Sequence, residues 1–260
     1  MVSDILSKKR VLVTRPKEQA SHLCELIINN GGEPILFPTI EIQAIVDSGS
    51  LSEKFEKIND YDFVFFISQN AVNIAFEYYL DCSNISERPV FIATGGSTAN
   101  ALRLRGIKNI IHAGMQADSE SLLMLSELQE GNIKDKKILI VRGKGGRELL
   151  AKTLQARGAK FEYAEVYQRC LPAYEVNERQ KVWQDMRTDA IIVTSNEGLE
   201  NLHMLTLEED KVKLFNTPLV VMSERAVELA KKLGFTSIIQ LVNDKNDEGL
   251  LSALIEITGD

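Results

Sequence analysis

Short runs of apolar residues alternate with helix-like segments along the whole chain. The apolar runs predict strands near residues 11–14, 62–67, 90–93, 108–111, 138–141, 189–193, 218–222 and 237–240. Between these runs, apolar residues recur at helical spacing and predict helices near 17–30, 70–80, 97–105, 119–128, 146–157, 196–204, 224–233 and 248–257. This alternation favours an α/β fold in which parallel sheets carry helices on both faces.

The second half of the sequence repeats the first. VLVTRPKEQASHLCELIINNGGE aligns with ILIVRGKGGRELLAKTLQARGAK at a constant offset (142 − 15 = 127), which places Arg15 on Arg142. DFVFFISQNAV aligns with DAIIVTSNEGL at the same offset (195 − 68 = 127), which places Ser68 on Ser195. The repeat predicts two parallel-sheet α/β domains that arose by internal duplication.

Polar residues and glycines stand where predicted strands pass into predicted helices. These positions are Arg15, Ser68, Thr94 to Gly96, Arg142, Ser195 and Ser223. In open parallel sheets such positions line the ligand crevice, and helix N-termini there attract anions. A serine before a helix is also an ordinary N-cap worth about 1 kcal/mol. The prediction of a carboxylate or phosphate site therefore depends on the number of these positions and on the two arginines.

The stretch ILIVRGKGG has the strand, glycine turn and helix outline of a nucleotide-binding loop. The dinucleotide motif G-x-G-x-x-G is not met, because Gly145 and Gly146 are followed by Arg147 and a glutamate. The phosphate-binding motif needs Ser or Thr after its lysine, whereas Lys144 precedes a glycine. The loop therefore argues against a nucleotide-dependent enzyme.

Composition narrows the class of protein further. With 260 residues, of which 44% are hydrophobic and 26% charged, the chain is typical of a soluble globular protein. No export segment or membrane-spanning run is evident, so a cytoplasmic location is expected. The formal charge of −7 argues against a nucleic-acid binder, so any anionic ligand must be held by local groups.

Cysteines and histidines give no sign of a metal site or a disulfide framework. They are scattered along the chain at Cys24, Cys82, Cys170, His22, His112 and His203. Because no two cysteines have the spacing of a zinc motif and the histidines are equally scattered, we expect no metal.

Several motifs together resemble one known family, uroporphyrinogen-III synthase. They are VLVTRP, FISQNAV, ATGGSTANAL, ILIVRGKGGRELLAKTLQARGA, VYQRCLP, VTSNEGLENL and SERAVELAKKLG, and they span nearly the whole chain. The resemblance implies a cytosolic, cofactor-free lyase of tetrapyrrole and haem biosynthesis. Such an enzyme cyclises the linear tetrapyrrole hydroxymethylbilane to uroporphyrinogen III, with loss of water and inversion of ring D.

The resemblance also implies a domain organisation. The family has two α/β domains joined by a two-stranded antiparallel ladder. Carried over, residues 1–36 and 173–260 form one domain, residues 45–164 form the other, and residues 37–44 and 165–172 form the ladder. A double connection of this kind permits opening and closing around a substrate.

Matching motifs carry over the site residues. Tyr167 in VYQR matches a tyrosine of the family's second linker strand, which implies the role of general acid toward the departing hydroxymethyl oxygen. Glu224 and Arg225 stand where some relatives carry threonines, although Arg225 could still contact a substrate carboxylate. The expected substrate-binding residues are Arg15, Ser68, Asn70, Gly95, Thr98, Arg142, Ser195, Gly198, Ser223 and Arg225.

The expected partner is the small-molecule substrate, with neither nucleic acid nor membrane. We expect a monomer, and leave open a transient contact with the preceding enzyme of the pathway. The alternative interpretation is a non-catalytic two-domain cleft protein that binds a small polyanion. Such a protein would not need Tyr167 at the ladder.

Overall fold

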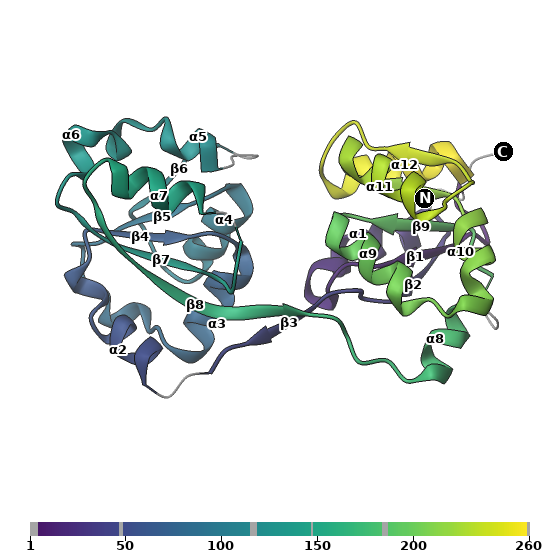
Figure 1. Ribbon diagram of the computed structural model, residues 1–260, viewed down its shortest axis with the longest axis horizontal. Coiled ribbons are helices and arrows are strands. Elements are labelled where there is room, and N and C mark those ends of the chain that lie inside the picture. The colour runs from purple at the N-terminus through teal and green to yellow at the C-terminus, as the bar shows by residue number, and fades with distance from the viewer. Residues whose placement is uncertain (1–4, 47–48, 115–118, 147, 184–186, 259–260) are drawn as a thin grey trace. The chain divides into compact units, whose positions relative to one another are not determined.

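The chain folds into two compact units, each built around one sheet (Figure 1). The computed structural model describes residues 5–46, 49–114, 119–146, 148–183 and 187–258. Unit 1 comprises Met1–Glu41 and Cys170–Asp260, and unit 2 comprises Ile42–Arg169. The first strand and helix of the chain therefore belong with its C-terminal part.

The sheet of unit 1 has five parallel strands in the order β11-β10-β9-β1-β2. The strands are β1 (Arg10–Val13), β2 (Glu33–Leu36), β9 (Ala190–Val193), β10 (Leu219–Val221) and β11 (Ile239–Leu241). The helices are α1 (Lys17–Asn29), α8 (Val176–Trp183), α9 (Asn196–Leu205), α10 (Lys211–Asn216), α11 (Glu224–Leu233) and α12 (Asp247–Thr258). This strand order reverses direction between β1 and β9, where α/β proteins commonly bind ligands.

Alternate residues of the unit 1 strands bury side chains on opposite faces of the sheet. Val11 and Val13 pack in one cluster with residues of α1 and α12, whereas Leu12 packs in a second cluster with residues of α9 and α11. All three side chains are fully buried. The strand is apolar throughout because both of its faces are covered, as expected for a parallel sheet between two helical layers.

The sheet of unit 2 has six strands in the order β3-β8-β7-β4-β5-β6. The strands are β3 (Glu41–Ala44), β4 (Phe63–Phe66), β5 (Val90–Ala93), β6 (Ile110–His112), β7 (Lys137–Gly143) and β8 (Lys160–Cys170). The helices are α2 (Ser50–Glu56), α3 (Gln69–Tyr78), α4 (Gly96–Leu104), α5 (Ser119–Leu123), α6 (Glu130–Ile133) and α7 (Leu149–Ala156). From β8 to β6 the paired strands are parallel.

The edge strand β3 runs against β8. The backbone N–H of Ile45 donates to the carbonyl of Val166 at 2.8 Å, and the side chain of Gln168 donates to that of Gln43 at 3.4 Å. Residue numbers thus rise on one strand as they fall on the other, which is the pattern of an antiparallel ladder. β8 therefore continues from the parallel sheet into the ladder at the boundary of the units.

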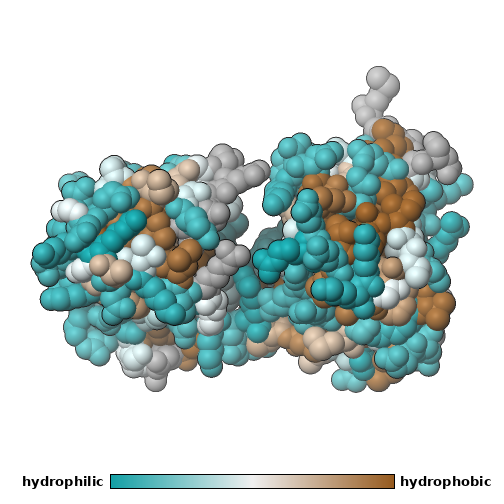
Figure 2. Space-filling view, turned by 45° about the horizontal axis from the view of Figure 1, so that its top comes forward, coloured by the Kyte–Doolittle hydropathy of each residue, from teal (hydrophilic) through white to brown (hydrophobic). Residues whose placement is uncertain are grey.

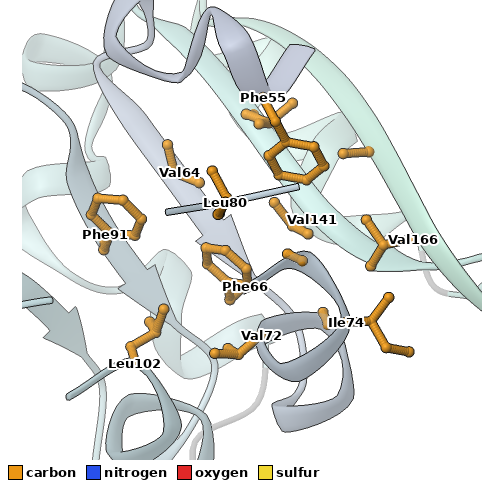
Figure 3. Packing of buried hydrophobic residues seen from close by; sticks show 14 of the residues in the cluster. Phe55, Val64, Phe66, Val72, Ile74, Leu80, Phe91, Leu102, Val141 and Val166 are labelled. Carbon is orange, nitrogen blue, oxygen red and sulfur yellow. The ribbon is translucent and has the colours of Figure 1, made fainter. Parts of the chain in front are cut away.

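Unit 2 also buries apolar residues on both faces of its sheet. Figure 3 shows one face, where Phe66, Phe91 and Val141 of the strands lie over Val72 of α3 and Leu102 of α4. The opposite face packs against residues of α5, α6 and α7. Close packing on both faces fixes the positions of the carboxyl ends of β4, β5 and β7, which lie side by side at the same end of the sheet.

The two sheets repeat one another in register. Val11 pairs with Ala190 in unit 1, and Phe63 pairs with Ile138 in unit 2. Ile138 is the repeat equivalent of Val11 (138 − 11 = 127), and Ala190 is the repeat equivalent of Phe63 (190 − 63 = 127). The predicted duplication is confirmed by this correspondence and by the identical order of the five parallel strands. The first strand, helix and strand of each half of the sequence belong to the unit formed mainly by the other half. They are β1, α1 and β2 in unit 1, and β7, α7 and β8 in unit 2.

Two segments differ from their predicted form. The helix predicted over 119–128 ends at Leu123, because the side-chain amide of Gln129 donates to the carbonyls of Leu123 and Leu125, at 2.9 Å each, which a continuous helix would use itself. The helix predicted over 146–157 begins at Leu149, and Arg147 lies outside the described residues.

The ladder is shorter than predicted on its first strand. Residues 37–40 are not in a strand, because the amides of Phe37 and Thr39 donate to the carbonyls of Val13 and Thr14 and keep this segment beside β1. The strand β2 and the first residues of β8 were not predicted from the sequence. Both segments are half exposed and contain Glu, Lys or Pro among their apolar residues. They therefore lack the continuous apolar run by which the other parallel strands were predicted.

Hydrophilic residues cover most of the face of unit 2 seen in Figure 2, while hydrophobic residues gather over part of the face of unit 1. In the part of the chain that the structure describes, no helix combines the length and apolar character that crossing a membrane requires. Within the same residues, no three His, Cys, Asp or Glu side chains are grouped so as to hold a metal ion.

Equivalent core positions provide a test of the repeated packing. Leu12 and Leu139 occupy equivalent positions of the duplication (139 − 12 = 127), and both are fully buried. Leu12→Ala and Leu139→Ala should each lower the free energy of unfolding by about 2–5 kcal/mol, because each leaves a cavity between a sheet and its helices. Leu104→Ala is the control, since 79% of Leu104 is exposed. Urea denaturation would contradict the repeated packing if only one of the core variants lost stability.

Candidate active site at the carboxyl ends of the strands

Tyr167 lies on β8 and is only 4% exposed. Its ring is pressed against Gly143, at the end of β7: a Cβ atom added to this glycine would lie 2.6 Å from Cε2 and Cζ of the ring. The backbone N–H of Lys144 donates to the carbonyl of Tyr167 at 2.7 Å. Glycine at position 143 is therefore needed for the tyrosine to occupy this place.

The hydroxyl group of Tyr167 is within hydrogen-bond distance of a serine hydroxyl. The hydroxyl oxygens of Ser68 and Tyr167 lie 3.0 Å apart. Ser68 is the N-cap of α3, and its Oγ accepts a hydrogen bond of 3.1 Å from the backbone N–H of Ala71. The serine therefore caps a helix and contacts the phenol with the same oxygen atom.

A pocket of about 300 Å³ opens beside Tyr167. Its lining is Ile67, Ile140, Arg142, Gly143, Lys144, Gly145, Gly146, Leu150, Ala151, Tyr163, Tyr167 and Arg169. Three of these side chains are cationic, and the carboxyl end of β7 and the glycine-rich turn form one wall. The pocket lies within unit 2, where the strand order reverses between β4 and β7.

Arg142 is the buried cation of this pocket, with 5% of the residue exposed. Its Nη1 lies 3.2 Å from a carboxylate oxygen of Glu148, and its Nε donates to the carbonyl of Gly143 at 3.2 Å. The guanidinium carbon also lies 4.8 Å from the centre of the Tyr163 ring. A buried charge needs such partners, because its removal from water is costly.

Tyr163 and Glu148 support one another. The hydroxyl of Tyr163 donates to Glu148 at 2.8 Å, and this hydrogen bond is the main reason that the pKa of the carboxyl group is lowered. Burial raises the pKa of Tyr163 to about 12, and the carboxylate adds to the increase. The phenol therefore keeps its proton at neutral pH, and Glu148, whose side chain is 47% exposed, keeps its negative charge beside Arg142.

The other predicted residues of unit 2 have different environments. Gly95 is the N-cap of α4 in an extended conformation, and Asn70 lies in the first turn of α3. Thr98 is only 3% exposed, so its hydroxyl is enclosed by the protein. The carboxyl ends of β4, β5 and β7 thus place Ser68, Gly95 and Arg142 at one edge of the sheet.

Arg15 belongs to a charged cluster in unit 1. Its guanidinium pairs with the carboxylate of Asp247, the first residue of α12, and both side chains are largely buried. Nδ1 of His22 lies 3.0 Å from the other carboxylate oxygen of Asp247. The hydrogen bond to Asp247 is the largest cause that raises the pKa of His22.

The serines predicted in unit 1 are N-caps. Ser195 Oγ accepts from the N–H of Gly198 at 3.0 Å, and Ser223 Oγ accepts from the N–H of Ala226 at 3.2 Å. A Cβ atom on Gly198 would lie 3.1 Å from Ser195 Oγ, so glycine allows the cap to form closely. Arg225 is exposed in the first turn of α11, next to Glu224.

Among the charged and aromatic side chains of the pocket, sequence reasoning missed three: Lys144, Tyr163 and Arg169. A signal for two of them was present. Tyr163 and Arg169 belong to the same strand as the predicted Tyr167. The predicted strand began only at residue 165, which left Tyr163 outside it.

Comparison with known proteins identifies the family. The family described as uroporphyrinogen-III synthase HemD matches residues 21–248. The chain belongs to the uroporphyrinogen-III synthase family. A uroporphyrinogen-III synthase from Salmonella typhimurium is 36% identical over 246 residues, which cover 94% of this chain and 99% of that protein. One from Escherichia coli is 34% identical with the same coverage.

Solved structures of the family share the fold. The uroporphyrinogen-III synthetase of Helicobacter pylori matches with a TM-score of 0.63 at 15% identity, covering 96% of this chain and 99% of that one. A mutant uroporphyrinogen III synthase of Thermus thermophilus matches with a TM-score of 0.57 at 18% identity, covering 95% and 99%. The predicted family and two-domain α/β fold are therefore confirmed.

The His22 and Asp247 pair predicts a pH dependence of stability. Because the folded state raises the pKa of His22 above 6.5, the pair stabilises the fold below that pH and loses this contribution as pH rises through the raised pKa. His22→Gln removes the titrating group. The difference in urea midpoint between the wild type and His22→Gln should therefore be larger at about pH 6 than at about pH 8.5. An equal difference at both pH values would show that the pair does not titrate as described.

Proposed function

We propose that this chain catalyses the closure of hydroxymethylbilane to uroporphyrinogen III, as a lyase of tetrapyrrole biosynthesis. The observation that carries the proposal is the match to named uroporphyrinogen-III synthases over 94% of the chain at 34–36% identity. The alternative of a non-catalytic polyanion-binding protein is not favoured, because the two relatives that match 94% of the chain at 34–36% identity are named uroporphyrinogen-III synthases.

The pocket of unit 2 suits a carboxylate side arm of the substrate. Hydroxymethylbilane carries an acetate and a propionate on each ring, whereas the protein has a formal charge of −7. Arg142, Lys144 and Arg169 supply local positive charge against that overall field. The exposed carboxylate of Glu148 competes for Arg142, so a substrate carboxylate would have to replace or share this partner.

Tyr167 is proposed as the general acid. Loss of the hydroxymethyl oxygen as water leaves an azafulvenium cation on ring A, and the substituted carbon of ring D attacks this cation to form a spiro intermediate. A phenol can give its proton to the departing oxygen, and the proton that is lost when the macrocycle closes restores the phenol. Support for this role comes from the place of Tyr167 beside the cationic pocket.

The remaining task of the protein is positioning. Unassisted closure gives the unrearranged isomer, so the enzyme must hold a flexible polyanion in the shape that leads to inversion of ring D. The helix N-termini capped by Ser68, Ser195 and Ser223, together with Gly95, Gly198 and Arg15, are proposed as further substrate contacts. Asn70, Thr98 and Arg225 remain predictions from the resemblance, as do the domain limits.

The direct test is to supply freshly made hydroxymethylbilane and separate the uroporphyrinogen isomers that form. We expect the type III isomer in the presence of the protein and the unrearranged isomer in its absence. If the added protein leaves only the unrearranged isomer, the proposed function is wrong.

Tyr167→Phe should lower turnover on the order of 100-fold, because one hydrogen-bond donor to the leaving oxygen is lost. The fold should persist, since the ring still fills its place against Gly143. Tyr79→Phe is the matched control: this partly buried phenol of unit 2 donates to the carbonyl of Ile45 at 2.7 Å, away from the pocket, and turnover should be unchanged. Full turnover of Tyr167→Phe would assign the acid role elsewhere.

Arg142→Ala should raise KM about 10-fold or more with a smaller effect on kcat, because it removes a charge-assisted contact that is equally strong before and during the reaction. Arg142→Lys should recover only part of the affinity, since an ammonium group cannot make the bidentate contact with a carboxylate that a guanidinium makes. Arg88→Ala removes the same charge from an exposed site beside Asp62 and should leave KM unchanged. Equal effects of Arg142→Ala and Arg88→Ala would mean that only net charge matters.

A further inference from the structure

We propose that Ser68 is a positioning residue for the reaction: it connects the N-terminus of α3 to the phenol of Tyr167 and leaves the phenol proton free for the departing oxygen. This inference rests on the proposed function and on the role of Tyr167 within it. It differs from the role that the family resemblance implies, in which Ser68 contacts the substrate itself.

The geometry fixes the direction of one hydrogen bond of Ser68 and allows the other to run from Ser68 to Tyr167. Ser68 Oγ accepts from the N–H of Ala71 at 3.1 Å and lies 3.0 Å from Oη of Tyr167. A serine hydroxyl has one proton to donate and lone pairs to accept with. The N–H of Ala71 occupies one lone pair of Ser68 Oγ and leaves the Ser68 proton able to be donated to Oη of Tyr167. If Ser68 donates, the proton of Tyr167 can point toward the substrate.

This direction also favours the chemistry. The N–H of Ala71 lies at the positive end of the α3 dipole, and a chain of hydrogen bonds polarises each member in turn. A hydrogen bond received at Oη favours the phenol that has given up its proton, because negative charge then develops on Oη. Ser68 would thus assist the proton transfer while holding the phenol in position.

The surroundings leave the phenol little freedom. The ring of Tyr167 is pressed against Gly143, and only 4% of the residue is exposed. The carbonyl of Tyr167 is also fixed by the N–H of Lys144. The position of Oη is therefore determined by packing on one side and by Ser68 at the tip.

A comparison of the two repeats distinguishes the proposed positioning role of Ser68 from ordinary helix capping. Ser195 occupies the position equivalent to Ser68 (195 − 127 = 68) and caps α9 through the N–H of Gly198. The position equivalent to Tyr167 is Ile40 (167 − 127 = 40), which has no hydroxyl group. Capping alone explains the serine in both units, but only unit 2 pairs its serine with a phenol, at the edge of the cationic pocket.

Two substitutions at position 68 distinguish capping from donation. Ser68→Asp keeps an N-cap that accepts from the N–H of Ala71, but an ionised carboxylate has no proton to donate to Oη. Ser68→Thr keeps both the cap and the donor. We expect kcat with hydroxymethylbilane to fall about 10-fold or more in Ser68→Asp and to stay within about 3-fold of the wild type in Ser68→Thr.

A double-mutant cycle tests whether Ser68 acts through Tyr167. We expect Ser68→Ala to lower kcat about 10-fold in the wild type and to have little further effect in Tyr167→Phe, which lacks the phenol oxygen. Ser195→Ala provides the stability control, because it removes the equivalent cap from unit 1. Urea midpoints of Ser68→Ala and Ser195→Ala should fall by similar amounts.

The outcomes separate the inference from the function on which it rests. If Ser68→Ala slows turnover by the same factor with and without the phenol hydroxyl, Ser68 acts independently of Tyr167 and the inference is wrong. Full turnover of both Ser68→Ala and Ser68→Asp would also overturn it and leave a cap alone, while a slow Tyr167→Phe variant would preserve the acid role. A fully active Tyr167→Phe variant would overturn the acid role and the inference together.

Discussion

The candidate site depends on one irregularity in the pairing of β7 with β8. Arg142 lies opposite Glu165, but the next residue, Gly143, lies opposite Tyr167, so β8 advances by two residues while β7 advances by one. A bulge of this kind re-aims the side chains that follow it. It brings the ring of Tyr167 over the glycine and its hydroxyl to Ser68. Without the shift, an otherwise regular sheet would present other residues to the pocket.

The electrostatics of the pocket follow from unequal burial of its charges. Arg142 is enclosed, whereas its partner Glu148 is exposed and Lys144 lies on the surface. A buried guanidinium interacts more strongly than an exposed one, because less water screens it. The protein can therefore attract a polyanion locally although its net charge is negative. In unit 1, Arg15 has its carboxylate partner largely buried, so its charge is more fully compensated.

The sequence was sufficient to predict the fold class, although not β2 or the start of β8, because the fold class follows from patterns that persist over many residues. Apolar strands, amphipathic helices and the constant offset between the two halves predict two similar parallel sheets, and the register of Val11 with Ala190 repeats that of Phe63 with Ile138. The site was less predictable. The bulge beside Gly143 leaves no mark in apolar periodicity, and the ion pairs of Arg142 and Arg15 join side chains whose contacts arise only on folding.

The duplication explains why two similar sheets carry different chemistry. Helix capping is a backbone requirement, so it is met in the same way by Ser68 and Ser195 in the two halves. The arginines are also repeated, but their partners differ: Arg142 pairs with Glu148, which is close to it in the sequence, and Arg15 pairs with Asp247 of a distant helix. Glu148 stands at the N-cap of α7 without a side-chain cap hydrogen bond, and its side chain is 47% exposed, whereas the side chain of Asp247 at the start of α12 is only 16% exposed. Unit 2 can therefore exchange a protein carboxylate for a substrate carboxylate at a smaller structural cost.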